Sequence, residues 1–272
     1  MRYRFIALDI DGTLANSRKE ISYANVAALD RAQEAGVKVA LVSGRPTFGI
    51  LPAARAIHLD RYGGYVFAFN GARVTHAGTG EVLYENALPP EELPRIQAAA
   101  HEFGVGMITY RPDCVLTETP DDRYVLLEAG INKMPVKGVP DIVKATQAPT
   151  AKSLLVGEPG YLADVEGVLR ERFPRLNVYR SEPYFLEIVP QFVDKAFALE
   201  RMLQVLGLTR DELLACGDGF NDVSMIRYAG MGVAVSNAQE DVKRAAAYVS
   251  PYSNDEDAVA HAVRRFVLDE ER

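Results

Sequence analysis

The chain contains 272 residues, of which 48% are hydrophobic and 25% are charged, as is ordinary for a globular protein of one large or two modest domains. Its formal net charge of −7 argues against nucleic acid or an anionic membrane as the main partner, because both repel an acidic surface. No stretch of the sequence approaches the roughly 20 apolar residues of a membrane-spanning helix. Composition leaves the oligomeric state open.

The two cysteines, Cys114 and Cys216, are far apart in the sequence and lack the spacing of metal ligands. Such sparse use of cysteine is typical of a reducing compartment, so we expect a cytoplasmic protein without a disulfide. Arg2 and Arg4 precede an apolar run that stops at Asp9, which is too short for the hydrophobic region of a secretion signal.

The first 81 residues alternate between strand-like and helix-like patterns. Short apolar runs predict buried strands, and apolar residues at helical spacing predict the helices between them. This alternation is typical of βαβ units in a parallel sheet. The predicted elements are a strand at 5–8, a helix at 23–35, a strand at 37–42, a helix near 48–57 and a strand at 65–69 that ends in the turn pair Asn70-Gly71.

The pattern changes in residues 82–189, which predict a separate α+β module. Pro89-Pro90 and Pro190 lie near its two ends and suit the linkers of an inserted domain. The predicted elements are a helix near 91–103, strands near 106–110 and 114–118, an irregular stretch, a strand at 152–156, a helix at 161–172, and an antiparallel pair at 177–180 and 184–189.

The alternation of helices and strands returns in the last part of the chain. The predicted elements are a helix at 195–207, a strand at 213–216, a helix at 223–228, a strand at 231–235, a helix near 238–246, a strand at 248–249 and a helix at 255–268. The sequence therefore predicts an α/β core domain made of residues 1–81 and 190–272, interrupted by an inserted domain at 82–189.

Acidic clusters follow two of the predicted strands. The segment DIDGT begins at Asp9, and the segment GDGFND contains Asp218 and Asp222. Ligands of open α/β sheets bind at the carboxyl ends of strands, and Asp9 and Asp11 leave their strand on the same side. Carboxylates this close need a cation, a proton or a wide solvent gap. Oxygen ligands suit Mg²⁺, although Mn²⁺ would fit them too, and Asn221 or Asp222 is placed to cap the next helix.

Four segments occur in a characteristic order: DIDGT from Asp9, VSGRP around Ser43, the isolated Lys195, and GDGFND around Asp218. They resemble the four motifs of the haloacid dehalogenase (HAD) superfamily of phosphohydrolases. The SGRP sequence, the segment FNGA at 69–72 and the long insert resemble the Cof-type group (subfamily IIB), which has a large α/β cap. The resemblance implies a Rossmann-like parallel-sheet core with an inserted α+β cap, and Mg²⁺-dependent hydrolysis of small phosphate esters such as sugar phosphates.

The resemblance also implies the roles of the acidic residues. Asp9 corresponds to the nucleophile that forms an aspartyl-phosphate, and Asp11 to the general acid and base. An Asp at its reference pKa of ~3.9 is almost fully ionised at neutral pH, so we expect the site to raise the pKa of Asp11. The implied metal ligands are Asp9, the backbone carbonyl of Asp11, and Asp218, with Asp222 in a supporting position.

Phosphate binding is implied for the side chain of Ser43, the amide of Gly44, Lys195 and Asn221. By itself, Ser43 could instead cap the helix after it, since Pro46 follows. Relatives of the Cof type usually have Gly after the motif lysine, where this chain has Ala196.

Asp194 precedes Lys195 and offers a helix N-cap that would keep the local geometry. Arg45 could reach the substrate or form a salt bridge with a nearby acid. Two other functions fit the same motifs. One is a sugar phosphomutase, and the other is a non-enzymatic protein that binds a phosphate or a partner.

Overall fold

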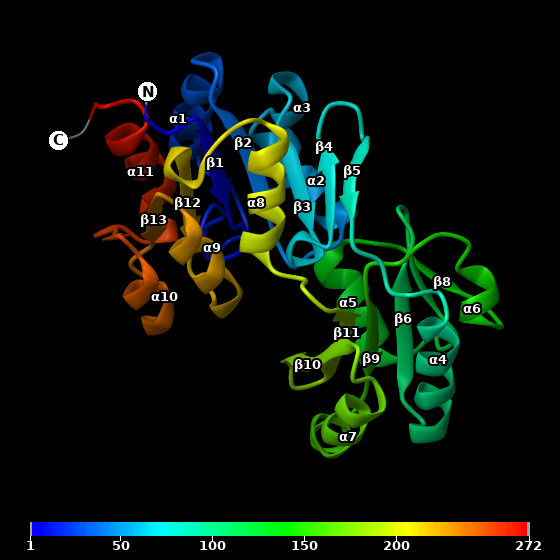
Figure 1. Cartoon of the computed structure of the whole chain (residues 1–272). Helices are drawn as coiled ribbons and strands as arrows, with labels where there is room; N and C mark the ends of the chain where they lie inside the picture. Colours follow the sequence, from blue (N-terminus) through cyan, green and yellow to red (C-terminus); the bar gives the residue numbers. More distant parts are fainter. Residues whose placement is uncertain (1, 271–272) are drawn as a thin grey trace. The chain divides into compact units, whose positions relative to one another are not determined.

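The computed structural model describes residues 2–270, which form two compact units. The core unit comprises the chain up to Tyr84 together with the chain from Asp194 onward, and the insert unit is Glu85–Val193. Figure 1 shows the helices and strands of both units. No helix among the described residues is long and apolar enough to cross a lipid bilayer.

The core unit is built on an eight-stranded sheet with the order β14-β13-β12-β1-β2-β3-β4-β5. The strands from β14 to β3 are parallel, and β4 is antiparallel to β3. Their bounds are β1 Phe5–Leu8, β2 Lys38–Val42, β3 Tyr65–Ala68, β4 Arg73–His76, β5 Val82–Glu85, β12 Leu213–Gly217, β13 Met231–Ala234 and β14 Tyr248–Val249.

Helices cover both faces of this sheet, as a parallel sheet requires. In Figure 1, α8 and α9 lie in front of the central strands, and α1 and α2 lie behind them. The helices are α1 Tyr23–Glu34, α2 Thr47–Ala56, α3 Leu59–Tyr62, α8 Lys195–Val205, α9 Val223–Tyr228, α10 Glu240–Ala245 and α11 Ala258–Phe266. Short 3-10 turns occur at η1 Phe69–Gly71, η2 Arg210–Glu212, η3 Phe220–Asp222 and η4 Asn254–Glu256.

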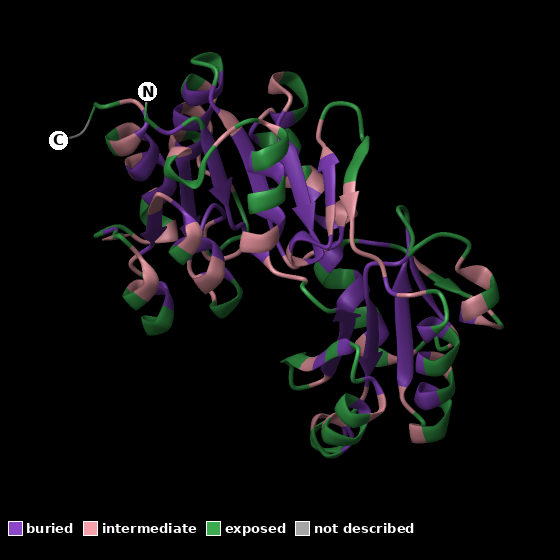
Figure 2. Cartoon of the chain, in the orientation of Figure 1, coloured by how far each residue is buried: buried purple, intermediate pink, exposed green. Residues whose placement is uncertain are grey.

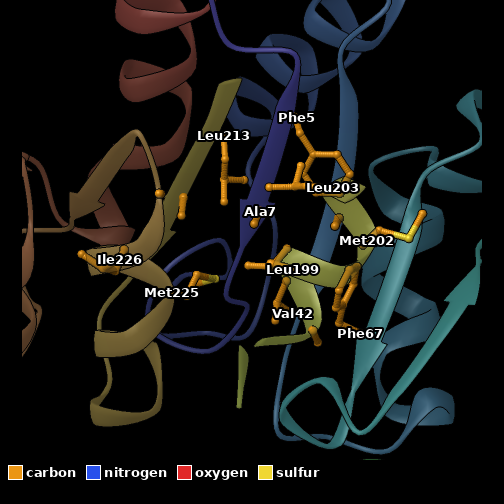
Figure 3. Packing of buried hydrophobic residues seen from close by; sticks show 14 of the residues in the cluster. Phe5, Ala7, Val42, Phe67, Leu199, Met202, Leu203, Leu213, Met225 and Ile226 are labelled. Carbon is orange, nitrogen blue, oxygen red and sulfur yellow. The ribbon is translucent and has the colours of Figure 1, made fainter. Parts of the chain in front are cut away.

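The central strands are buried because both of their faces pack against helices (Figure 2). On the face covered by α8, Leu199 and Leu203 contact the apolar surface around Phe5 and Phe67, as Figure 3 shows. Burial of one large apolar side chain contributes about 1.5–3 kcal/mol, so this layer is a main source of the stability of the core unit. The strands that carry the acidic clusters are therefore held rigidly.

The insert unit contains a six-stranded sheet with the order β10-β11-β9-β6-β7-β8. Its neighbouring strands are antiparallel except for the parallel pair β7 and β8. The strands are β6 Gly106–Tyr110, β7 Val115–Thr117, β8 Val136–Gly138, β9 Ser153–Val156, β10 Leu176–Glu182 and β11 Phe185–Pro190. The helices are α4 Glu92–Phe103, α5 Arg123–Asn132, α6 Ile142–Ala145 and α7 Pro159–Arg172.

The stretch predicted as irregular contains α5, β8 and α6, so that prediction was wrong. Asp122 caps α5, because its Oδ1 accepts hydrogen bonds from the amides of Tyr124 (2.8 Å) and Val125 (3.2 Å). The helical pattern of α5 is hard to read from the sequence because Leu126 and Ile131 are exposed, with 52% and 47% of their surface accessible. Apolar residues on both the exposed and the buried side blur the helical period. The turn pair Asn70-Gly71 is typical of a hairpin and leads into β4, but α3, β4 and β5 were not predicted as elements.

The strand order decides where the acidic clusters meet. After β1 the chain continues to β2 on one side, whereas the neighbour of β1 on the other side is β12, from the last part of the chain. The carboxyl end of a parallel sheet at such a reversal of strand order is where ligands bind. Asp9 follows β1 and Asp218 follows β12, so these two residues border that position.

Candidate active site

Three charged side chains form a buried cluster at the carboxyl ends of β1 and β12. The Nζ of Lys195 donates hydrogen bonds to Asp9 Oδ1 at 2.7 Å and to Asp222 Oδ1 at 2.6 Å. Lys195 and Asp222 have no accessible surface, and Asp9 has 6%. Buried charges are stable only when they are paired, and here one ammonium group serves two carboxylates.

This arrangement leaves the cluster with an excess of negative charge. Burial raises the pKa of Asp9 well above its ordinary value, and the carboxylate of Asp222 raises it further, whereas Lys195 lowers it. Burial would lower the pKa of Lys195, but its two carboxylate partners outweigh burial and raise it. The lysine therefore stays charged, whereas the ionised form of Asp9 is disfavoured.

Asp218 lies next to the segment that follows β1. Its Oδ1 accepts a hydrogen bond of 2.6 Å from the hydroxyl of Thr13. Gly12 has a φ of +83°, and a Cβ at this position would lie 2.3 Å from Asp218 Oδ2, so only glycine permits this approach. Burial, aided by the charge of Asp222, raises the pKa of Asp218 from 3.8 to about 6.

Asp9, Asp218 and Asp222 form a set of acids that fits a metal ion. One carboxylate oxygen of each residue lies within 4.8 Å of the others. Carboxylate oxygens are hard donors, which suit Mg²⁺ or another hard divalent cation. Burial is the main reason that the pKa values of Asp9 and Asp218 are raised, and a bound cation would favour their ionised forms.

Asp222 shapes the loop that carries Asp218. Its Oδ2 accepts hydrogen bonds from the amides of Asp218 (3.0 Å) and Gly219 (2.9 Å), while its Oδ1 accepts from Lys195. The prediction that Asn221 or Asp222 caps the next helix was wrong, because no side chain caps α9. Asp222 is instead committed to the loop and to the lysine.

Asp11 lies apart from the buried cluster and is held by two cations. Arg45 donates to both of its oxygens, from Nε at 2.7 Å and from Nη2 at 2.6 Å, and Lys19 Nζ donates to Oδ1 at 2.9 Å. The structure thus places Arg45 in a salt bridge with an acid. Burial would raise the pKa of Asp11, but these bonds and charges outweigh burial and lower it. The expectation of a raised pKa was wrong in this arrangement, because the sequence did not reveal the two cations.

Ser43 lies at the end of β2 and is buried, with 3% of its surface accessible. Its amide donates to the carbonyl of Phe67, and its Oγ accepts a hydrogen bond of 3.2 Å from the amide of Arg45. The helix α2 begins at Thr47 and its N-cap position is Pro46, so Ser43 does not cap it. The hydroxyl hydrogen of Ser43 remains available to an anion at this edge of the sheet.

The lysine keeps a well-defined position although Ala196 follows it. Asp194 caps α8, as predicted, because its Oδ1 accepts from the amides of Ala196 (2.8 Å) and Phe197 (3.1 Å). Lys195 is the first residue of the helix, and the cap fixes the direction in which its side chain leaves. Ala196 supplies only its amide to this arrangement, so the missing glycine has no visible consequence.

Comparison with known proteins identifies the family of the chain. A model of the haloacid dehalogenase-like hydrolases matches residues 6–263. The chain belongs to this family. It is 32% identical to YxeH of Bacillus subtilis, which is named as a phosphatase, over 98% of this chain and 99% of that protein. The resemblance predicted from the four motifs is thus confirmed.

Solved structures of similar proteins agree with the α/β fold predicted for this HAD-like hydrolase. A hydrolase of the family from Bacteroides thetaiotaomicron is 46% identical, with a TM-score of 0.93 over 97% of this chain and 99% of its own. A sugar phosphatase of HAD subclass IIB is 25% identical, with a TM-score of 0.78 over 97% of this chain and 98% of its own. The family and these relatives identify the chain as a phosphoric monoester hydrolase.

Several residues of this hydrolase were not recognised as site residues from the sequence. Thr13 belongs to the DIDGT segment, and its position beside two acids was the available signal. Lys19 lies in a polar segment and gave no signal at all. Asn70 was expected in a turn that could also line the entrance of the site, but its contact was not foreseen: its side chain accepts a hydrogen bond of 3.1 Å from Asn221 Nδ2.

Proposed function

We propose that this hydrolase cleaves phosphate monoesters of small metabolites, such as sugar phosphates, with the help of Mg²⁺. The observation that carries the proposal is the set of three carboxylates of Asp9, Asp218 and Asp222. Asp9 and Asp222 are buried and paired with Lys195, and Asp218 is half-buried. In this proposal Asp9, the backbone carbonyl of Asp11, and Asp218 hold the cation, and Asp222 supports them. The cation supplies positive charge that lets an anionic nucleophile and an anionic phosphate approach each other.

Asp9 is the proposed nucleophile. Its Oδ1 is fixed by Lys195, so the carboxylate has a defined orientation toward an incoming phosphorus atom. In the first step a carboxylate oxygen of Asp9 bonds to phosphorus, the bond to the ester oxygen breaks, and Asp11 gives a proton to the leaving alkoxide. In the second step Asp11 takes a proton from water, which attacks the aspartyl-phosphate and releases inorganic phosphate.

Asp11 must change partners to act as an acid. In the described arrangement Arg45 and Lys19 favour its ionised form, which cannot donate a proton. The phosphate of a substrate is an alternative anion for both cations. Loss of part of this ion pairing would let the pKa of Asp11 rise toward the value that proton donation to an alkoxide requires.

The proposed phosphate contacts come from three places in the core unit. Ser43 and the amide of Gly44 follow β2, Lys195 begins α8, and Asn221 follows β12. Oriented donors of this kind stabilise the charge of the transferring phosphoryl group, which is the main task in phosphoryl transfer.

Because both cysteines are buried and free, the proposal also places the protein in the cytoplasm.

The test is phosphate release from a panel of phosphorylated metabolites, measured for the wild-type protein and for Asp9→Asn, with Mg²⁺ and with a chelator. We expect turnover that requires the metal and is lost in the variant. The rank order of the esters then identifies the substrate class. Metal-independent turnover, or an Asp9→Asn variant as active as the wild type, would contradict the proposed mechanism.

A further inference from the structure

The turn between β3 and β4 has a strained backbone at the carboxyl end of the sheet. Phe69, Asn70 and Gly71 have consecutive positive φ values of 52°, 56° and 90°. Left-handed backbone suits glycine and is tolerated by asparagine, but it is unfavourable for phenylalanine. Strain of this kind persists only where the surrounding contacts impose it, and it occurs preferentially at functional sites.

The contacts that impose this strain come from the proposed phosphate site. The amide of Phe69 donates to the carbonyl of Arg45 at 3.0 Å, and the amide of Asn70 donates to the carbonyl of Ser43 at 2.9 Å. A Cβ on Gly71 would lie only 2.5 Å from the Cβ of Ala198 in α8, so the turn is also pressed against the helix that begins with Lys195.

The side chain of Asn70 connects the two other parts of the site. Its Oδ1 accepts a hydrogen bond of 3.1 Å from Asn221 Nδ2 in the loop after β12. A Cβ placed on Gly44 would lie 3.4 Å from both the Oδ1 and the Nδ2 of Asn70. The amide group of Asn70 therefore lies between the loop after β2 and the loop after β12.

We propose that Asn70 is a positioning residue for phosphate binding, an inference that rests on the function proposed above. Asn221 has two amide hydrogens, and Asn70 binds one of them. Within the described part of the chain the other forms no hydrogen bond and is free to meet a phosphate oxygen. By fixing the amide of Asn221, Asn70 spares the substrate the entropic cost of ordering that side chain. The strained turn keeps Asn70 in the place where it can do so.

Two substitutions separate this role from the role of the turn. In Asn70→Gly the side chain is removed, but glycine accepts a φ of 56°, so the turn should persist. In Asn221→Ala the partner is removed. Lys133→Gly is the matched control, because Lys133 is also left-handed, with a φ of 52°, and lies at the end of α5 in the insert unit. Urea denaturation of each variant reports whether the fold is retained.

The measurements are the affinity for inorganic phosphate by calorimetry in Mg²⁺, and kcat and KM for p-nitrophenyl phosphate. We expect Asn70→Gly to weaken phosphate binding roughly 2- to 12-fold, the range that one hydrogen bond gives, and to raise KM by a similar factor with a smaller change in kcat. Because Asn70 acts through Asn221, adding Asn70→Gly to the Asn221→Ala variant should change its phosphate affinity by less than about 2-fold. Lys133→Gly should bind phosphate as the wild type does.

The inference and the proposed function fail in different ways. If the wild type releases phosphate and Asn70→Gly binds phosphate with unchanged affinity, only the inference is overturned. Losses that multiply in the double variant would also overturn it, because Asn70 would then act independently of Asn221. A wild type that neither binds phosphate nor releases it would overturn the proposed function and the inference together.

Discussion

Replacement of Lys195 by methionine removes the single positive charge of the buried cluster. The ammonium group lies 2.7 Å from Asp9 Oδ1 and 2.6 Å from Asp222 Oδ1, and neither Lys195 nor Asp222 has any accessible surface. Loss of one partner from a buried ion pair costs about 3–5 kcal/mol. Because methionine preserves most of the side-chain volume, a loss of this size would report the missing charge.

Urea denaturation in the presence of a chelator measures this loss as a change in the free energy of unfolding. The matched control is Lys243→Met, since Lys243 pairs with the exposed Glu240 on the surface, where an ion pair contributes about 0–1 kcal/mol. Added Mg²⁺ should stabilise Lys195→Met more than the wild type, because it replaces the missing positive charge. A loss below about 1 kcal/mol, equal to that of the control, would refute the view that Lys195 neutralises the cluster.

Three further outcomes follow from the titrating groups. Arg45→Gln should move the limb of the pH–rate profile that belongs to Asp11 to higher pH, because Arg45 lowers its pKa; an unchanged profile would contradict this. Folding raises the pKa of Asp218 from 3.8 to about 6, so the stability of the metal-free protein should fall as the pH rises from about 4 to about 6. Mg²⁺ should raise the melting temperature more at about pH 8 than at about pH 5, because it binds the ionised carboxylate. Burial raises the pKa of Cys216 to about 12, and Cys114 is also buried, so an aromatic disulfide should modify neither thiol faster than the protein unfolds.

The sequence was sufficient to predict the α/β fold because the signals for its parallel strands are local. The apolar run before Asp9 and the one before Asp218 each stop at a carboxylate and a glycine, and buried strands of a parallel sheet have this form. Two such runs with helices between them place their acids at one edge of the sheet whatever the details of the loops. The meeting of Asp9 and Asp218 could therefore be expected from topology alone.

The partners of Asp11 and Asp222 could not be predicted in the same way. Arg45 follows Asp11 by 34 residues, and their pairing depends on the direction of two side chains at the ends of neighbouring strands. Asp222 could equally have capped α9, and only the position of Lys195 shows that its carboxylate is used elsewhere. Electrostatic environments depend on distances of a few ångströms, which residue spacing does not specify.

The order in which the site is filled follows from its charges. Asp9, Asp218, Asp222 and Lys195 together carry three negative charges and one positive charge when ionised, so the cluster has a net formal charge of two negative units. A phosphate dianion entering the metal-free site meets this field in a partly buried region, where screening by water is weak. A divalent cation cancels the net charge, so we expect the cation to bind before the phosphate.

Calorimetry with inorganic phosphate tests this order, once with Mg²⁺ and once with a chelator. The coupling is reciprocal, so phosphate should also increase the affinity of the protein for Mg²⁺ by the same factor. Asp218→Asn provides the control, because removing one negative charge should reduce the dependence of phosphate binding on the cation. Equal phosphate affinity in Mg²⁺ and in chelator would contradict the charge argument, because the carboxylates would then present no barrier that a cation removes.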